Sequence, residues 1–288
     1  MELTAKHITM QFGKMKALNQ ISCTFSSGGL IGLVGPNGAG KTTLLKILAT
    51  LLRPTNGTVT LDGTDIVKHP EAMKKALGYL PQDVAVYPNL TAAEFLSYMA
   101  SMKRISRADA KRQIPELMEI LHLSGTGNKR LSEFSGGMRQ RVGIACALLG
   151  KPKVLIVDEP TTGLDPQERI TLRNYLSQVA KDRIVILSTH IISDIEAVAS
   201  KVLILKQGSL VFNGTPSQLV SNAHGYVWEY IQPNGEALRD INGISSMIQR
   251  KDGIRVRQIS NHKPVPDAQP VDASLEDACL YALEGASL

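Results

Sequence analysis

The sequence predicts an α/β fold that is organised around a parallel sheet. Three apolar runs, at residues 30–34, 154–157 and 184–187, have the length and composition of strands buried on both faces of such a sheet. Strand-like and helix-like segments alternate from residue 151 onward, which is the pattern of successive strand–helix–strand units. Each run ends in reactive polar groups, so we expect one edge of the sheet to carry the chemistry.

The first part of the chain predicts a small antiparallel β subdomain. Residues 1–28 read as short strands, in which residues 21–25 alternate between apolar and polar side chains before a Ser/Gly turn. A further strand at 58–61 enters a hairpin-type turn at residues 62–63.

A helical subdomain is predicted at about residues 90–150. The pairs Thr91–Glu94 and Ser106–Asp109 are capping-box signals, and each opens a helical pattern. Because proline lacks a backbone N–H, we expect Pro115 to kink or interrupt the second of these helices.

The end of the chain predicts a small α+β appendage at residues 225–288. Residues 253–259 alternate like a strand with a basic face, and the proline-rich stretch 263–270 reads as a stiff, extended linker. Ser274 is placed to cap a last helix with one apolar face. The sequence assigns no chemistry to this appendage.

A phosphate-binding loop follows the first apolar run. Residues 35–42 read Gly-Pro-Asn-Gly-Ala-Gly-Lys-Thr, between a predicted strand and a predicted helix. Lys41 is expected to reach the terminal phosphates of a nucleoside triphosphate, and the Thr42 hydroxyl to hold Mg²⁺. An ordinary glycine-rich turn does not require Gly-Lys-Thr in this order. The residues expected around the phosphates are Gly35, Pro36, Asn37, Gly38, Ala39, Gly40, Lys41, Thr42 and Thr43.

Four further side chains are expected at the same edge of the sheet. Asp158 can reach the Mg²⁺ held by Thr42, and Glu159 can deprotonate an attacking water. His190 follows the third run, and Gln82 follows a shorter apolar stretch and can bind the metal or the water. Taken alone, each of these motifs also fits a solvated strand end or a structural residue. Their convergence on one edge favours a shared site.

A second anion site is predicted where residues 135–137, Ser-Gly-Gly, open a helix. Ser135 is a good N-cap, and Gly136 and Gly137 leave the backbone N–H groups open. A flexible helix start is the alternative interpretation of this segment.

Composition excludes several classes of protein. We find no apolar run near the roughly 20 residues that a spanning helix needs, and no signal-peptide core at the N-terminus. The net charge of +6 is moderate, and the basic clusters lack interleaved aromatics, so no nucleic-acid partner is expected. Cys23, Cys146 and Cys279 are expected to be buried free thiols.

Together these motifs resemble the nucleotide-binding subunit of an ATP-binding cassette (ABC) transporter over about residues 3–220. The resemblance implies a P-loop ATPase domain at residues 1–222. Gly35–Thr42 resembles Walker A, 131–141 the family signature and 154–159 Walker B with a catalytic glutamate. Gln82 resembles the Q-loop glutamine, Asp165 the D-loop aspartate, His190 the switch histidine and Phe12 the adenine-stacking aromatic.

The signature departs from the commonest family pattern at two positions. Phe134 stands where leucine is commonest, and Met138 where glutamine is commonest. Ser135 and Gly137, which contact phosphate in the family, are intact, so little functional loss is expected. Phe12 keeps a stacking ring without the hydroxyl of the more common tyrosine.

The resemblance further implies a head-to-tail dimer, in which Ser135, Gly136 and Gly137 of one subunit close the ATP site of the other. Asp165 would help to couple the two sites. A homodimer is the simpler expectation because every motif is intact. The implied partner is a separate integral membrane permease, which holds the subunit at the cytoplasmic, inner face of the cell membrane. The segment 82–96 and the last helix resemble exporter ATPases for drugs, bacteriocins and lipids.

Two alternatives belong to other functional classes. An ABC-type ATPase that acts on ribosomes or DNA usually has two fused cassettes or long coiled coils, and this chain has one cassette. A small-molecule kinase or GTPase does not need the second phosphate-binding helix start at Ser135.

Overall fold

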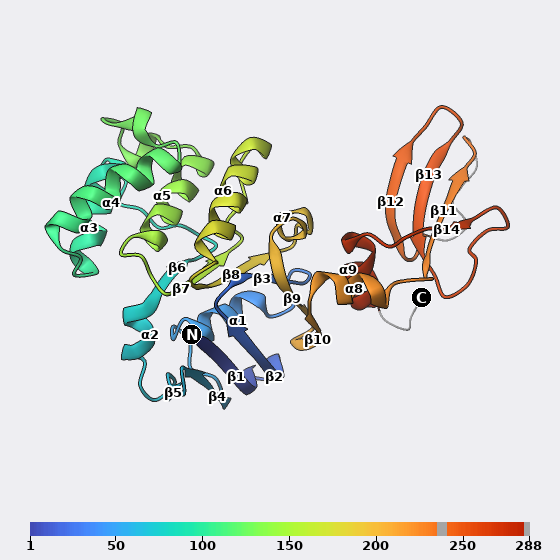
Figure 1. The fold of residues 1–288 in the computed structure, drawn as a ribbon, viewed down its shortest axis with the longest axis horizontal. Helices are drawn as coiled ribbons and strands as arrows, with labels where there is room; N and C mark the ends of the chain where they lie inside the picture. Colours follow the sequence, from blue (N-terminus) through green and yellow to red (C-terminus); the bar gives the residue numbers. More distant parts are fainter. Residues whose placement is uncertain (235–240, 285–288) are drawn as a thin grey trace.

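The computed structural model describes residues 1–234 and 241–284 and confirms the α/β fold. A helical region, two central sheets and a C-terminal appendage follow one another along the long axis of the molecule (Figure 1). Residues 235–240 and 285–288 of the predicted appendage lie outside the described residues.

The three predicted buried runs lie together in the central six-stranded sheet, which has the order β10-β9-β3-β8-β7-β6. They form β3 (Gly29–Val34), β7 (Val154–Asp158) and β8 (Ile184–Thr189), and β8 pairs in parallel with both others. Every residue of β7 and β8 is buried, which explains their continuous apolar sequences. The other strands are β6 (Leu77–Leu80), β9 (Ala199–Lys206) and β10 (Ser209–Gly214), of which only β10 is antiparallel to its neighbour.

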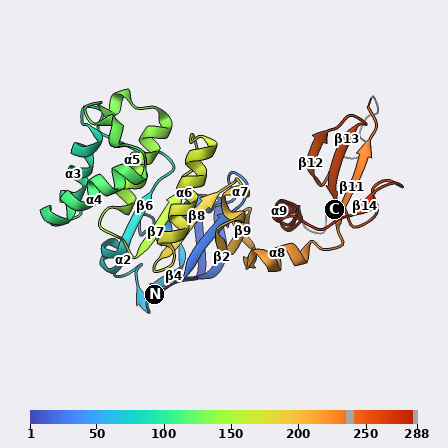
Figure 2. The same ribbon diagram turned by 45° about the horizontal axis from the view of Figure 1, so that its top comes forward.

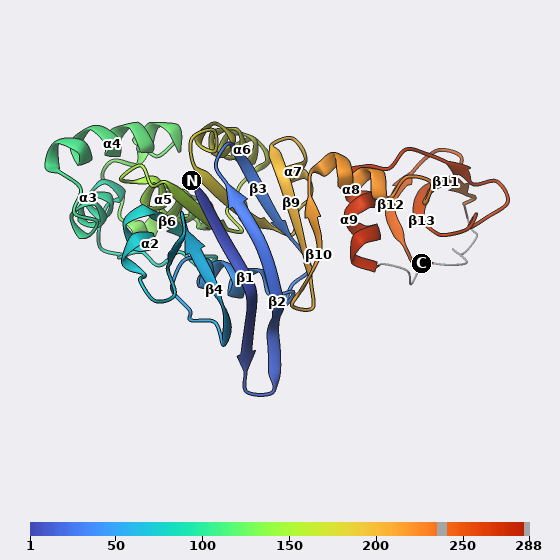
Figure 3. The ribbon, with the colours of Figure 1, turned by 60° about the horizontal axis from the view of Figure 1, so that its bottom comes forward.

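The predicted N-terminal antiparallel sheet is present, with the order β2-β1-β4-β5. Residues 21, 23 and 25 are buried, so the alternation in this segment is confirmed. The strands are longer than the short ones expected, because β-bulges let β1 and β2 stay paired through register shifts. Figure 3 shows this hairpin extending away from the rest of the molecule. The strands are β1 (Glu2–Phe12), β2 (Met15–Ser26), β4 (Asn56–Leu61) and β5 (Thr64–Asp65).

The helical region contains α3 (Ala92–Met102), α4 (Arg107–Ile120) and α5 (Gly136–Leu148). The side chain of Thr91 caps α3 and that of Ser106 caps α4, as predicted. The predicted interruption at Pro115 is wrong, because α4 continues through it. Burial of Ile114, Leu117 and Met118 on the inner side of α4 offsets the loss of one helical hydrogen bond.

The remaining helices lie between or beside the sheets. Their bounds are α1 (Lys41–Leu48), α2 (Glu71–Ala76), α6 (Pro166–Val179), α7 (Ser193–Glu196), α8 (Pro216–Asn222) and α9 (Leu275–Glu284), with 3-10 turns at Ser124–Thr126 and Leu131–Glu133. None of the helices within residues 1–234 and 241–284 is long and apolar enough to cross a membrane.

The appendage contains a four-stranded antiparallel sheet with the order β12-β13-β11-β14. The basic face predicted at residues 253–259 is present, but Arg255 and Arg257 lie beside Glu229, so their charges are paired. The stretch 263–270 is not a simple extended linker, since a turn closes between Val265 and Ala268 before the chain pairs with β11. The strands are β11 (Val227–Gln232), β12 (Ile244–Gln249), β13 (Ile254–Ile259) and β14 (Gln269–Pro270).

The last helix connects the appendage to the central sheet. Figures 1 and 2 show α9 beside α8, between the central sheet and the appendage sheet. Leu275, Ala278 and Cys279 of α9 share one apolar core with Leu219 and Ala223 at α8. The appendage is therefore joined to the first part of the chain by packing as well as by the backbone.

Candidate functional site

The phosphate loop connects β3 to α1, as the sequence predicted. Gly40, at the start of α1, has φ +102°, and a Cβ there would lie 2.7 Å from the carbonyl oxygen of Ala17. Gly35 is as constrained, since a Cβ would lie 2.3 Å from the carbonyl oxygen of Leu205. Neither position accepts a side chain without a shift of the backbone, which explains why the loop carries glycine there.

Lys41 lies within the curve of this loop and is 6% exposed. Its Nζ donates to the carbonyl oxygens of Gly35 (2.7 Å) and Pro36 (3.2 Å), and it lies 4.0 Å from Oε1 of Glu159. Burial lowers the pKa of Lys41, while the charges of Glu159 and Asp158 act in the opposite direction. The ammonium group is therefore held by two carbonyl oxygens and one more distant carboxylate at the place where phosphate is expected.

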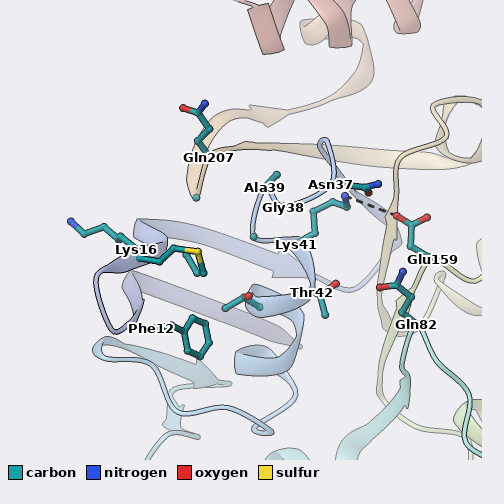
Figure 4. Close-up of a pocket in the computed structure, with 15 residues that line it drawn as sticks. Phe12, Lys16, Asn37, Gly38, Ala39, Lys41, Thr42, Gln82, Glu159 and Gln207 are labelled. Carbon is teal, nitrogen blue, oxygen red and sulfur yellow. Dashed lines mark ion pairs between the residues drawn. The ribbon is translucent and has the colours of Figure 1, made fainter.

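A cavity of about 610 Å³ opens in front of the loop. Figure 4 shows Lys41, Glu159 and Gln82 gathered at one end of it, and Phe12 at the other. This separation suits a ligand with a polyanionic part and a flat, apolar part. The cavity brings together ten of the predicted site residues: Phe12, Asn37, Gly38, Ala39, Gly40, Lys41, Thr42, Thr43, Gln82 and Glu159.

Glu159 connects several parts of this site. Its Oε2 lies 2.9 Å from Nδ1 of His190, and its backbone N–H donates to the carbonyl oxygen of Ser188 at 3.0 Å. Its φ of +51° is unfavourable for a residue with a side chain, a feature that clusters at functional sites. The backbone after β7 is thus turned so that the carboxylate lies between Lys41 and His190.

Asp158 lies at the end of β7 and is completely buried. Neither of its carboxylate oxygens has a hydrogen-bond partner. A buried, unpaired carboxylate is unfavourable unless a cation or a water compensates its charge. With the Thr42 hydroxyl and the Gln82 amide in the adjoining cavity, these oxygen donors fit a hard divalent cation such as Mg²⁺.

The second predicted anion site lies outside this cavity. Ser135 caps α5 by accepting the N–H of Met138 at 3.2 Å, and Ser135 and Gly136 are exposed. Gly137 is partly covered because it packs closely against the backbone of Gly163. These three residues do not line the phosphate-loop cavity.

Asp165 also lies outside the cavity, where it caps α6 by accepting the N–H of Glu168 at 2.8 Å. Gly35, Pro36 and His190 line a smaller neighbouring cavity of about 320 Å³ that α9 helps to enclose. His190 nevertheless joins the main site through Glu159.

Sequence reasoning missed five residues that line the main cavity. Met15, Lys16 and Ala17 come from the β1–β2 hairpin, and Gln207 and Gly208 from the turn between β9 and β10. Figure 4 shows Lys16 and Gln207 at the Phe12 end of the cavity. No local motif marks these residues, because tertiary structure alone brings the hairpin and the turn to the loop.

The chain is similar to proteins of one known family. The family model described as "ABC transporter" matches residues 18–162. The uncharacterized ABC transporter ATP-binding protein YxlF of Bacillus subtilis is 37% identical over 217 residues, which are 75% of this chain and 72% of that protein. The linearmycin resistance ATP-binding protein LnrL of the same organism is 34% identical over 224 residues, or 77% of this chain and 72% of that protein.

A solved structure supports the same fold. The dimeric structure of a bacterial ABC transporter cassette superposes with a TM-score of 0.69 at 24% identity, over 74% of this chain and 98% of that one. The chain belongs to the ABC transporter family. Within that family it is an ATP-binding and ATP-hydrolysing subunit, as the motifs predicted.

Proposed function

We propose that this subunit powers export of a small molecule through a separate membrane permease, as half of a head-to-tail dimer. Export is supported by the similarity to a linearmycin resistance ATP-binding protein. The dimer is supported by the position of Ser135 and Gly136. Both residues are exposed at a helix start that lies outside their own subunit's ATP cavity. An exposed anion-binding helix start outside one subunit's ATP cavity is available for another subunit's nucleotide.

In this proposal Glu159 accepts the proton of the attacking water, and His190 holds the Glu159 carboxylate in place at 2.9 Å. Lys41 exchanges its carbonyl acceptors for the more strongly attracting phosphate oxygens of ATP. Gln82 orients the water. Thr42, Gln82 and Asp158 would hold Mg²⁺, which would supply positive charge beside the phosphates.

The two ATP sites each take residues from both subunits. Ser135, Gly136 and Gly137 bind the terminal phosphate of the partner's ATP, and Asp165 couples the two sites. A homodimer is proposed because this chain carries both halves of the site. The adenine stacks on Phe12, which is 45% exposed at the far end of the cavity.

An apolar groove of about 430 Å³ is the proposed contact with the permease. It lies between the segment after β6 and α3, where Tyr87 (53%), Tyr98 (41%) and Met102 (65%) are more exposed than large apolar side chains usually are. Tyr87 makes edge-to-face contacts with Phe95 and Tyr98, and all three rings line the groove. We place the subunit at the cytoplasmic face of the membrane through this contact.

We also propose that residues 1–222 form the ATPase domain and residues 225–288 an accessory domain. The α8–α9 packing joins the two, so the accessory domain is placed to affect the ATPase directly. Removing residues after Gly225 should then change the ATPase rate or dimerisation. An unchanged rate, dimer and permease contact would leave the appendage with a packing role only.

The substitution Glu159→Gln tests the catalytic assignment. The amide keeps the shape of the side chain but cannot accept a proton, so hydrolysis should slow by about 10²- to 10⁴-fold. ATP binding should persist, and a stable dimer should accumulate in ATP, as measured by light scattering. Glu116→Gln, on the exposed side of α4, is the matched control. Turnover of Glu159→Gln at the wild-type rate would show that another residue is the base.

Co-purification from detergent-solubilised membranes tests the partner. An integral membrane chain should be recovered with the wild-type subunit and lost after Tyr98→Glu, which places a charge in the groove. Stable association with ribosomes or DNA, without a membrane chain, would instead support the non-transport alternative.

A further inference from the structure

The signature helix contacts the segment that carries its own subunit's catalytic glutamate. Gln140, in the second turn of α5, is 7% exposed, and its Nε2 donates to the main-chain carbonyl of Glu159 at 3.3 Å. One turn earlier, a Cβ on Gly137 would lie 2.8 Å from the carbonyl oxygen of Gly163. The first two turns of α5 therefore rest directly on the backbone that follows β7.

The hydrogen bond from Gln140 is made to a strained part of the backbone, at Glu159. Glu159 has φ +51°, and such a conformation persists only where the surrounding structure holds it. Its N–H donates to Ser188, and its carbonyl accepts from the N–H of Thr162 at 3.3 Å as well as from Gln140. Ser188 and Thr162 come from the adjacent strand and loop, whereas Gln140 comes from the signature helix.

A second link joins α5 to α6. Arg141, the next residue of α5, places its Nη1 2.9 Å from Oε1 of Glu168 in the first turn of α6. Both side chains are largely buried, at 14% and 21% exposure, so the pair is less screened than a surface pair. Two side-chain contacts of α5 therefore lie at the two ends of the segment from Glu159 to Glu168.

We infer that Gln140 is a positioning residue that links the partner's ATP to the glutamate of its own subunit. The inference rests on the proposed dimer, in which the start of α5 binds the partner's terminal phosphate. Docking of that phosphate at Ser135, five residues before Gln140, fixes the helix, and the existing contact of Gln140 then fixes the Glu159 carbonyl. The carboxylate of Glu159 is then aimed at the water in its own site.

The substitution Gln140→Met tests this role because methionine keeps the length and burial of glutamine and removes the donor. Loss of one buried hydrogen bond that orients the base should lower kcat about tenfold. The KM for ATP should stay within about twofold, since the residues of the ATP cavity are untouched. Gln140→Leu serves in the same way where the methionine variant folds poorly.

The matched control is Gln113→Met. Gln113 is a second buried glutamine, 5% exposed, and its Oε1 accepts the N–H of Gly150 at 2.9 Å, at the other end of the helical region. Its loss should lower thermal stability and leave kcat unchanged. Equal losses of kcat in Gln140→Met and Gln113→Met would show that the Gln140 side chain supports folding and does not position Glu159.

Mixed dimers separate a role toward the subunit's own glutamate from a role toward the partner's phosphate. In the first dimer, one chain carries both Gln140→Met and Glu159→Gln, and the other chain is wild type. In the second, the two substitutions are on opposite chains, so the remaining Glu159 lies in the chain that carries Gln140→Met. Two different affinity tags isolate each dimer.

The second mixed dimer should hydrolyse ATP about tenfold more slowly than the first. Equal rates or the reverse order would overturn the inference, because Gln140 would then act through the partner's site or not at all. The proposed function fails in a different way. A Glu159→Gln protein that stays monomeric in ATP overturns the dimer and the inference together, whereas a normal dimer with equal rates overturns the inference alone.

Discussion

The buried carboxylate of Asp277 should hold the appendage together, and its neutralisation is a measurable perturbation. Asp277 is 1% exposed and accepts hydrogen bonds from Arg257 Nη2 at 2.6 Å and from the N–H and hydroxyl of Ser274 at 2.8 and 2.7 Å, and also from the Ser245 hydroxyl. These contacts join α9 to β12 and β13. Asp277→Asn keeps the shape of the side chain and removes the charge.

The expected magnitude follows from the environment of Arg257. Breaking a fully buried ion pair costs about 3–5 kcal/mol, but Arg257 is 23% exposed and keeps a second carboxylate, Glu229, at 3.7 Å. We therefore expect a loss of about 2 kcal/mol. For a unit this small, with a urea dependence of about 1 kcal/mol per molar, the midpoint should fall by about 2 M.

The single tryptophan gives a local assay. Trp228 lies on β11, so its fluorescence during urea titration reports the unfolding of the appendage. Asp272→Asn, at an exposed carboxylate two residues before Ser274, is the control and should leave the midpoint unchanged. A midpoint for Asp277→Asn within about 0.3 M of the wild type would refute the assigned strength of this cluster.

The same cluster predicts a dependence on pH. Burial by itself would raise the pKa of Asp277, but hydrogen bonds from Arg257, Ser245 and Ser274 outweigh it and lower the pKa below its ordinary value of 3.8. The stabilisation is therefore complete above that value and is lost as the pH falls through the lower pKa of the folded state. The difference between wild type and Asp277→Asn should shrink in acid, and a difference that grows there would contradict this sign.

Three further outcomes are expected. Lys41→Ala should weaken ATP binding by at least about tenfold in a fluorescent-nucleotide titration, because it removes a charge-assisted phosphate contact; unchanged affinity would place the phosphates elsewhere. Phe12→Tyr should bind ATP as the wild type does and Phe12→Ala should bind it about five- to tenfold more weakly; equal affinities would remove the ring from the adenine site. Burial raises the pKa of each of the three thiols, Cys23, Cys146 and Cys279, to about 12. Thiol reagents at pH 8 should therefore modify the folded protein slowly and the urea-unfolded protein quickly. Rapid modification of the native state would contradict this.

The sequence predicts those parts of the site in which the functional residues directly follow a buried strand. The phosphate loop, Asp158 and Glu159 each follow an apolar run, and parallel pairing brings such loops to one edge. Lys16 and Gln207 could not be found in this way. They reach the cavity through the curvature of a long bulged hairpin and a turn at the far side of the sheet, neither of which has a local signature.

Local rules failed where packing outweighed propensity. Pro115 is compatible with an unbroken α4 because neighbouring apolar side chains bury its inner face. Cys146 is only partly buried, whereas Cys23 and Cys279 are buried as predicted. The basic strand at 253–259 carries paired charges, since its partners Glu229 and Asp277 come from segments that are distant in sequence.

The position of α9 has a consequence for the order in which the chain can fold. Leu219 and Ala223 are covered by a helix that is synthesised about 60 residues later, or about 3–12 s later at ordinary translation rates. During that interval an apolar surface beside the central sheet stays open to solvent and to chaperones. The packing of α8 is therefore completed only after α9 is made, and a nascent chain stalled between residues 223 and 275 should bind chaperones more than the full chain does.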